Sequence, residues 1–225
     1  MSNPLVLVVG AGPGVSGSVA RAWGRRGHEV ALIGLDIEQL TELGEELKAD
    51  GTPAGWTDAD VTDADSLVAA VDRLVGYSGR LDVLHFNPSA YREATPLELT
   101  VPDLLADVAL GVGALLTAVQ AARPFMGPGG RITATGSIAA DRPSHRAASL
   151  GVQKAALRNL VHSIDATLAP DGIRAVSLTV DGVLDREDPT SPFHPDRVAE
   201  ALVAAAEQDE AGWRSELVHS RRAGS

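Results

Sequence analysis

Four glycines fall within eight residues near the start of the chain, at Gly10, Gly12, Gly14 and Gly17. Because glycine has no side chain, a turn rich in it lets the backbone approach a phosphate closely. The turn follows the apolar run Leu5–Val9 and leads into a helical pattern, and the free N–H groups of a helix N-terminus attract negative charge. This order of strand, glycine-rich turn and helix predicts the entry to a dinucleotide-binding unit. The alternative is a tight turn that binds nothing.

Two polar residues further along the chain could act beside such a turn. Ser137 ends the expected strand 129–137, and α/β sheets bind ligands at the C-terminal ends of their parallel strands. Lys154 is one of only two lysines among 19 basic residues. Its ammonium is a compact charge with three donors, which suits it to hold polar groups of a ligand. The alternatives are a serine that caps a turn and a lysine exposed on a helix.

The hydrophobic pattern predicts the elements that position these residues. It alternates strands and helices over nearly the whole chain. Strands are expected at 5–9, 28–34, 52–59, 81–86, 129–137, 173–179 and 215–218. One helix is expected to start at residue 15, and further helices are expected at 36–50, 65–77, 102–125, 146–168 and 195–207. We therefore predict an α/β fold in one domain over residues 1–225. This would be a Rossmann-like, doubly wound parallel sheet of about seven strands with helices on both faces.

The glycine spacing also carries a family resemblance. Gly10-x-x-x-Gly14-x-Ser16 resembles the G-x-x-x-G-x-G turn of the short-chain dehydrogenase/reductase family, with Ser16 in place of the third glycine. The similarity covers about residues 5–219. It implies an NAD(P)-binding oxidoreductase whose cofactor lies on Gly10, Gly14, Val15 and Ser16. It also implies a homodimer or homotetramer built on the long helices 102–125 and 146–168.

The resemblance assigns further contacts with the cofactor. It places Asp60 and Val61 beside the adenine and Asn87 on the adenine side of the central strand, while Lys154 would hold the nicotinamide ribose. A helix cap at the end of a strand is an alternative role for Asp60, and both roles can hold together. Only Asn87 is retained from the Asn-Ala-Gly turn of relatives, and the following Pro88 predicts a different loop geometry.

The choice between NAD and NADP depends on the end of the second strand. An acidic group there can hold the ribose hydroxyls, whereas an arginine suits a 2′-phosphate. The family positions for these groups fall on Gly34 and Leu35, so the chain has neither. Asp36 is a candidate ribose ligand, but as a helix cap it fits better, with Gln39 three residues on. The absence of a nearby cation favours NAD over NADP.

The active-site positions of the family are only half matched. Relatives use a serine, a tyrosine and lysine in Y-x-x-x-K, and an asparagine that holds a relay water. Ser137 and Lys154 match, whereas Leu150 stands at the tyrosine and Ala109 at the asparagine. No tyrosine follows Tyr91, so the usual proton donor is missing.

A different donor would have to replace that tyrosine. The candidates are Tyr91, His145, Ser149 and a water molecule. Tyr91 lies in a loop that the resemblance places near the nicotinamide, although an ordinary surface tyrosine is the alternative. Relatives have Pro-Gly where this chain has Asp181-Gly182, and the segment 185–195 is short for a lid, which predicts an open site.

The bulk composition excludes several classes of protein. A net charge of −11, with 30 acidic against 19 basic residues, argues against a nucleic-acid partner. There is no cysteine for a disulfide or thiol site, and no pair of the six histidines has metal-binding spacing. We see neither a membrane span nor a leader, so we expect a cytoplasmic protein that binds a dinucleotide and an unknown small molecule. The segment 219–225 is expected to be mobile.

Three functions agree with this pattern. The first is an NAD(P)-dependent oxidoreductase with a rerouted proton donor, because a missing general acid costs only about 10²–10⁴-fold in rate. The second is a sensor or partner subunit that binds a dinucleotide without turning it over. The third is a non-redox cyclase or lyase that uses the cavity with Leu150 as apolar lining.

Overall fold

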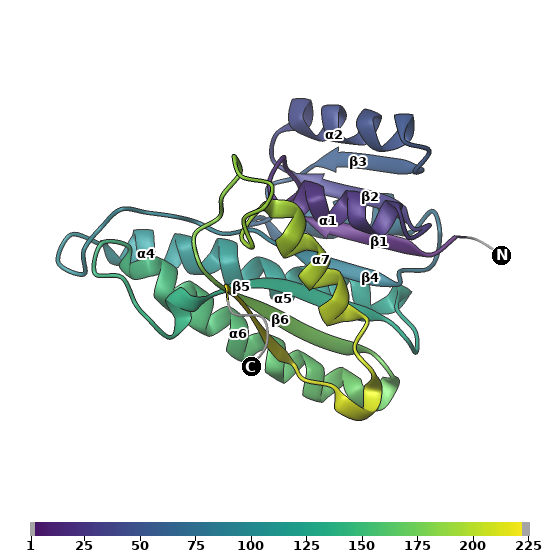
Figure 1. Ribbon diagram of the computed structural model, residues 1–225. Helices are drawn as coiled ribbons and strands as arrows, with labels where there is room; N and C mark the ends of the chain where they lie inside the picture. Colours follow the sequence, from purple (N-terminus) through teal and green to yellow (C-terminus); the bar gives the residue numbers. More distant parts are fainter. Residues whose placement is uncertain (1–2, 222–225) are drawn as a thin grey trace.

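The computed structural model describes residues 3–221, and its strands form one parallel sheet (Figure 1). All six strand pairs are parallel, in the order β3-β2-β1-β4-β5-β6-β7. The strands are β1 Leu5–Val9, β2 Glu29–Gly34, β3 Ala54–Asp58, β4 Val83–Phe86, β5 Arg131–Ser137, β6 Arg174–Asp181 and β7 Glu216–Ser220. The predicted Rossmann-like sheet of seven strands is confirmed.

Seven α-helices connect these strands within the described residues. They are α1 Val15–Gly24, α2 Ile37–Ala49, α3 Ala64–Val75, α4 Val101–Val108, α5 Ala114–Ala122, α6 Ala148–Leu168 and α7 Pro195–Ala206. Their bounds differ from the predicted ones by a residue or two at most ends, as is usual for sequence-based boundaries. The predicted tail was set too early, because His219 and Ser220 belong to β7, and residues 222–225 lie outside the described part of the chain.

The sheet is covered on both faces because its central strand is apolar on both sides. In β1, Val6 and Val8 pack with α1, α2 and α7, whereas Leu5, Leu7 and Val9 face α3, α5 and α6. Side chains alternate between the two faces of a strand, so a strand buried on both faces has an unbroken apolar run. This is the double winding predicted from the sequence.

The predicted helix 102–125 is continuous but not uniform. It runs as α4, a π-helical segment Ala109–Gly113, α5 and a short 3₁₀ turn Arg123–Phe125. Within residues 3–221 it is the one helix long and apolar enough to cross a membrane. Its inner residues Leu115, Ala118 and Ala122 lie in the sheet core, however, and a core helix passes the same test of length and composition.

The strand order reverses between β1 and β4. From β1 the chain winds outward to β3, and from β4 it winds in the opposite direction to β7. In open α/β sheets a crevice forms beyond the C-terminal ends of the strands at such a reversal. The glycine-rich turn follows β1 and Asn87 follows β4, so both lie at this point.

Candidate functional site

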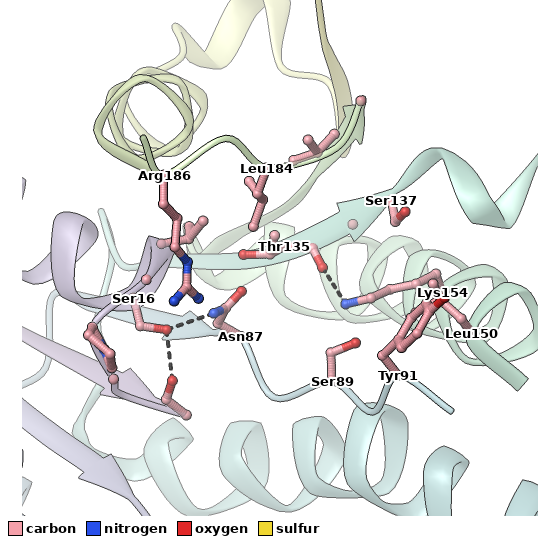
Figure 2. Close-up of a pocket in the computed structure, with 18 residues that line it drawn as sticks. Ser16, Asn87, Ser89, Tyr91, Thr135, Ser137, Leu150, Lys154, Leu184 and Arg186 are labelled. Atoms are coloured by element: carbon pink, nitrogen blue, oxygen red, sulfur yellow. Dashed lines mark hydrogen bonds between the residues drawn. The ribbon is translucent and has the colours of Figure 1, made fainter. Parts of the chain in front are cut away.

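A cavity of about 540 Å³ opens at the reversal point, at the C-terminal ends of β1, β4, β5 and β6 (Figure 2). The glycine-rich turn forms one side of it, and α6 contributes to the other. It is lined by Gly10, Gly12, Pro13, Gly14, Val15, Ser16, Asn87, Ser89, Tyr91, Thr135, Gly136, Ser137, Leu150, Lys154, Val180, Gly182, Leu184 and Arg186.

The glycine-rich turn needs its glycines for close packing. Gly10 has φ +79°, and a Cβ there would lie 2.8 Å from the ring of Pro88. A Cβ on Gly17 would lie 2.7 Å from the carbonyl oxygen of Gly12. Gly14 caps α1 without a side-chain hydrogen bond, and the first turn of the helix carries no acidic residue. The positive end of α1 is therefore left uncompensated beside the cavity.

Ser16 joins this turn to the neighbouring strand. Its Oγ donates to the carbonyl oxygen of Gly10 at 2.7 Å and accepts from Nδ2 of Asn87, also at 2.7 Å. With its proton already donated, the hydroxyl acts as a structural link between the ends of β1 and β4. The resemblance had placed the cofactor on this serine.

Lys154 is buried and directed at β5. Only 5% of the residue is exposed, which excludes the alternative of a lysine on the surface of a helix. Its Nζ donates to the carbonyl oxygen of Thr135 at 2.9 Å, and burial lowers its pKa from 10.5 to about 8. No carboxylate of the described residues forms an ion pair with it. The ammonium thus retains donors for a polar ligand in the cavity.

Ser137 and Leu150 lie on the same cavity, as Figure 2 shows. The Oγ of Ser137 accepts from the backbone N–H of Ala139 at 3.2 Å, so the residue also caps the 3₁₀ turn that follows β5. Leu150 supplies an apolar wall. Ala109 begins the π-helical segment and is absent from the lining.

Of the candidate proton donors, Tyr91 is the one in the cavity lining. It is 72% exposed, and Figure 2 draws its ring beside Leu150 and Lys154. The next residue, Arg92, donates to both carboxylate oxygens of the buried Asp107 at 3.0 and 3.1 Å. This ion pair ties the Tyr91 loop to α4 and holds the pKa of Asp107 below its usual range.

The other two side-chain candidates lie elsewhere. Ser149 is 1% exposed, and its hydroxyl has no hydrogen-bond partner within the described residues. His145 is exposed and lines a separate groove with Pro143 and Val101. Neither residue is part of the cavity lining.

Of the residues assigned to the adenosine end, Asn87 lines the cavity, whereas Asp36, Asp60 and Val61 lie outside the lining. Asp36 accepts from the N–H groups of Glu38 and Gln39 and caps α2. Asp60 accepts from Thr62 at 2.7 and 2.9 Å, which lowers its pKa, and Val61 packs in the core. A helix cap and a turn are thus the interactions that these acids make here.

The end of β2 has no room for an acidic side chain. A Cβ on Gly34 would lie 2.7 Å from the carbonyl oxygen of Ala11. The glycine-rich turn therefore packs directly on the residue that would carry the acid. This contact gives a packing reason for the glycine at this position.

The structure adds Ser89, Thr135, Leu184 and Arg186 to the lining. Ser89 donates to Oε1 of the buried Gln153 at 2.8 Å. Arg186 is the one arginine of the segment 182–194, directly after β6. A single arginine beyond the end of a strand was the signal in the sequence for a cavity residue. That signal is weak, because Asp185 and Glu187 flank the arginine and a sequence does not show where its side chain points.

Comparison with known proteins agrees with this geometry. The short chain dehydrogenase family matches residues 4–185. Cis-4-hydroxycyclohexanecarboxylate dehydrogenase of Sinomonas cyclohexanicum is 32% identical over 173 residues, which cover 76% of this chain and 69% of that one.

Solved structures agree in fold over almost the whole chain. A short chain dehydrogenase of Burkholderia cenocepacia J2315 in complex with NADP is 26% identical with a TM-score of 0.84, covering 96% of this chain and 95% of that one. A metagenomic short-chain oxidoreductase in complex with NADP is 24% identical, with the same TM-score and coverage. These NADP complexes lend no support to the predicted preference for NAD.

Proposed function

This chain belongs to the short-chain dehydrogenase family, and we propose that it is an NAD(P)-dependent oxidoreductase acting on a carbonyl or alcohol compound with a non-standard proton donor. One observation carries the proposal. The glycine-rich turn, Ser137 and Lys154 line a single cavity at the reversal point of the sheet. In an α/β sheet this is where a ligand binds.

The residues present fit a dinucleotide. The turn leaves the N-terminus of α1 open beside the cavity, because Gly14 adds no side chain and no side chain caps the helix. Such an end favours a pyrophosphate. The Lys154 ammonium, held 2.9 Å from the Thr135 carbonyl oxygen, would bind the nicotinamide ribose. A bound nicotinamide would supply or accept the hydride.

The chain's own residues would orient the substrate and move the proton. The Ser137 hydroxyl would donate to the substrate oxygen and polarise the carbonyl. The Tyr91 hydroxyl would give that oxygen its proton during reduction and take it back during oxidation. Because Tyr91 is largely exposed, solvent can restore its proton after each turnover.

A second candidate function is dinucleotide binding without turnover. Leu150 favours it, since an apolar side chain occupies the position where relatives have tyrosine and cannot transfer a proton. The protein would then serve as a sensor or as a partner subunit. No feature of the cavity favours the non-redox cyclase or lyase over these two.

The first experiment is a calorimetric titration of the purified protein with NADH and with NADPH. Micromolar affinity for either supports the dinucleotide site, and the ratio of the two affinities measures the cofactor preference. Absence of binding to both would reject the oxidoreductase and the sensor together and leave the non-redox enzyme.

Turnover separates the two dinucleotide-binding functions. In a screen of carbonyl compounds, Tyr91→Phe should lower kcat by about 10²–10⁴-fold with little change in cofactor affinity. Tyr77→Phe is the matched control, because Tyr77 is exposed and lies outside the cavity. Reduction that appears only after Leu150→Tyr would instead favour the binding protein.

We also propose that the chain forms a homodimer or homotetramer through α4, α5 and α6. Leu105 and Leu116 are exposed on the outer side of the long helix. A groove of about 410 Å³ runs between α5 and α6 beside Leu116. One domain over residues 1–225 and a cytoplasmic location stay predictions of the sequence.

A further inference from the structure

Arg186 extends from the segment after β6 toward the glycine-rich turn (Figure 2). Its Nη2 lies 3.0 Å from the point that a Cβ on Gly14 would occupy. Gly14 is the N-cap of α1. A guanidinium and the start of a helix, far apart in the sequence, thus face each other across one end of the cavity.

This approach brings two positive groups together. The N-terminus of a helix carries a partial positive charge, and α1 has neither a side-chain cap nor an acidic residue in its first turn. Within residues 3–221, Arg186 forms neither a hydrogen bond nor an ion pair. Facing groups of like sign repel, so the arrangement favours an anion between them.

Two acidic residues close to Arg186 in the sequence, Asp185 and Asp188, accept hydrogen bonds within their own loop. The Asp185 carboxylate accepts from the N–H groups of Glu187 and Asp188, and Asp188 accepts from Thr190. Neither is paired with the guanidinium. Some arginines elsewhere on the protein are paired instead, as Arg21 is with Glu46 and Arg158 with Asp141.

The segment that carries Arg186 is held at both ends. Asp185 donates its N–H to the carbonyl oxygen of Phe193 at 3.1 Å, and Phe193 is 4% exposed. Closer to β6, a Cβ on Gly182 would lie 2.2 Å from the Phe193 ring, so the chain passes directly over that ring. The backbone that carries Arg186 is therefore anchored on Phe193, while the Arg186 side chain itself is exposed.

We propose that Arg186 binds the pyrophosphate of the dinucleotide against the first turn of α1. The inference rests on the proposed dinucleotide site and assigns it a residue of this chain. A planar guanidinium offers a fork of N–H donors that fits phosphate oxygens, while the helix N–H groups approach from the opposite side. Gly14 leaves the space in which these donors meet.

The position of Arg186 distinguishes the pyrophosphate from a 2′-phosphate. The guanidinium lies at Gly14, whereas a 2′-phosphate is bound near the end of the second strand, at Gly34 and Leu35. Arg186 should therefore increase the affinity for NADH and the affinity for NADPH by the same factor. A residue that reads the 2′-phosphate would favour NADPH alone.

The test is calorimetric titration of wild type, Arg186→Gln and Arg186→Lys with NADH and with NADPH. We expect Arg186→Gln to weaken the affinities for NADH and NADPH by a similar factor, about 10- to 100-fold for the loss of a charged hydrogen-bonding group. The affinities of Arg186→Lys should lie between those of wild type and Arg186→Gln. The dependence of affinity on salt should also become less steep. Arg197→Gln is the matched control, because Arg197 is exposed, nearby in sequence and outside the lining.

Each outcome has one meaning, provided that circular dichroism shows the variants folded. If wild type binds the dinucleotides and Arg186→Gln binds them with the same affinity, the role of Arg186 is overturned and the proposed function is left intact. A loss confined to NADPH also overturns it, since that result assigns Arg186 to the 2′-phosphate. No binding by wild type overturns the proposed function, and this inference with it.

Discussion

Lys154 and Leu150 face the same cavity from one turn of α6. Lys154 matches the residue of relatives at its position, whereas Leu150 does not. The lysine keeps a buried ammonium beside β5, which costs free energy of folding. Leu150 stands at the position where relatives have the tyrosine that donates the proton beside this ammonium. A buried charge retained without an ion-pair partner among the described residues points to a ligand that repays its cost.

The first prediction concerns the stability cost of Lys154. Burial lowers its pKa from 10.5 to about 8, so between these values the unfolded chain binds a proton that the folded chain lacks. The free energy of unfolding therefore rises with pH across that window. Allowing for the lost hydrogen bond to Thr135, Lys154→Met should raise it by about 2 kcal/mol at pH 7. The gain should shrink as the pH rises above 8.

Chemical denaturation at pH 7, 8.5 and 10 measures this effect. Lys48→Met is the matched control, because Lys48 is the other lysine, is exposed and pairs with Glu45. It should show no comparable dependence on pH. A loss of stability in Lys154→Met at pH 7 would contradict the prediction. The variant should also bind dinucleotide more weakly, an exchange of stability for function.

At the scale of elements, the π-helical segment Ala109–Gly113 adapts the long helix to α6. Gly111 is buried there, and a Cβ on it would lie 2.3 Å from Cγ of Gln153. Gln153 precedes Lys154 and accepts from Ser89 in the cavity wall. The absence of a side chain at Gly111 thus sets how closely the two helices approach beneath the cavity.

The second prediction compares two glycines of this segment. Gly111→Ala should lower the free energy of unfolding by about 1–3 kcal/mol, because the methyl group overpacks against Gln153. Gly113→Ala is its control. Gly113 has helical dihedrals and nothing within 4 Å of a Cβ, so alanine should stabilise by about 0.4–1 kcal/mol.

Thermal unfolding of both variants under one set of conditions tests this pair. Opposite shifts in Tm are expected, downward for Gly111→Ala and upward for Gly113→Ala. Equal shifts would show that the contact with Gln153 is not tight. Because Gln153 adjoins Lys154, we also expect Gly111→Ala to weaken dinucleotide binding more than Gly113→Ala.

At the scale of the whole molecule, the two sides of the sheet differ in what covers them. The cover of α1, α2 and α7 has ion pairs at its surface, such as Arg21 with Glu46 and Arg26 with Glu200. The long helix on the other side exposes Leu105 and Leu116. Exposed leucines on one helix suit contact with a second copy of the chain.

The third prediction follows from that face. Wild type should elute as a dimer or tetramer in size-exclusion chromatography with light scattering. Leu116→Glu should shift it toward the monomer, because a carboxylate would be buried in the contact. Val68→Glu on α3 is the control and should leave the assembly unchanged. A clean wild-type monomer would contradict the proposed face.

The sequence by itself determined the fold and several residues that line the cavity. An unbroken apolar run marked β1, the glycine spacing marked the turn, and the rarity of lysine marked Lys154. These signals are local, because each is visible within a few residues. An apolar run indicates burial on both faces of a strand, a cluster of glycines indicates a close approach of the backbone, and a rare lysine indicates a selected cation.

Only the tertiary structure decided which polar groups face the cavity. Ser16 is tied to Asn87, and Arg186 reaches Gly14 from a distant segment. No local pattern predicts these directions. They depend on how the ends of β1, β4 and β6 pack together, and residue types do not show whether a polar group bonds its neighbour or a distant ligand.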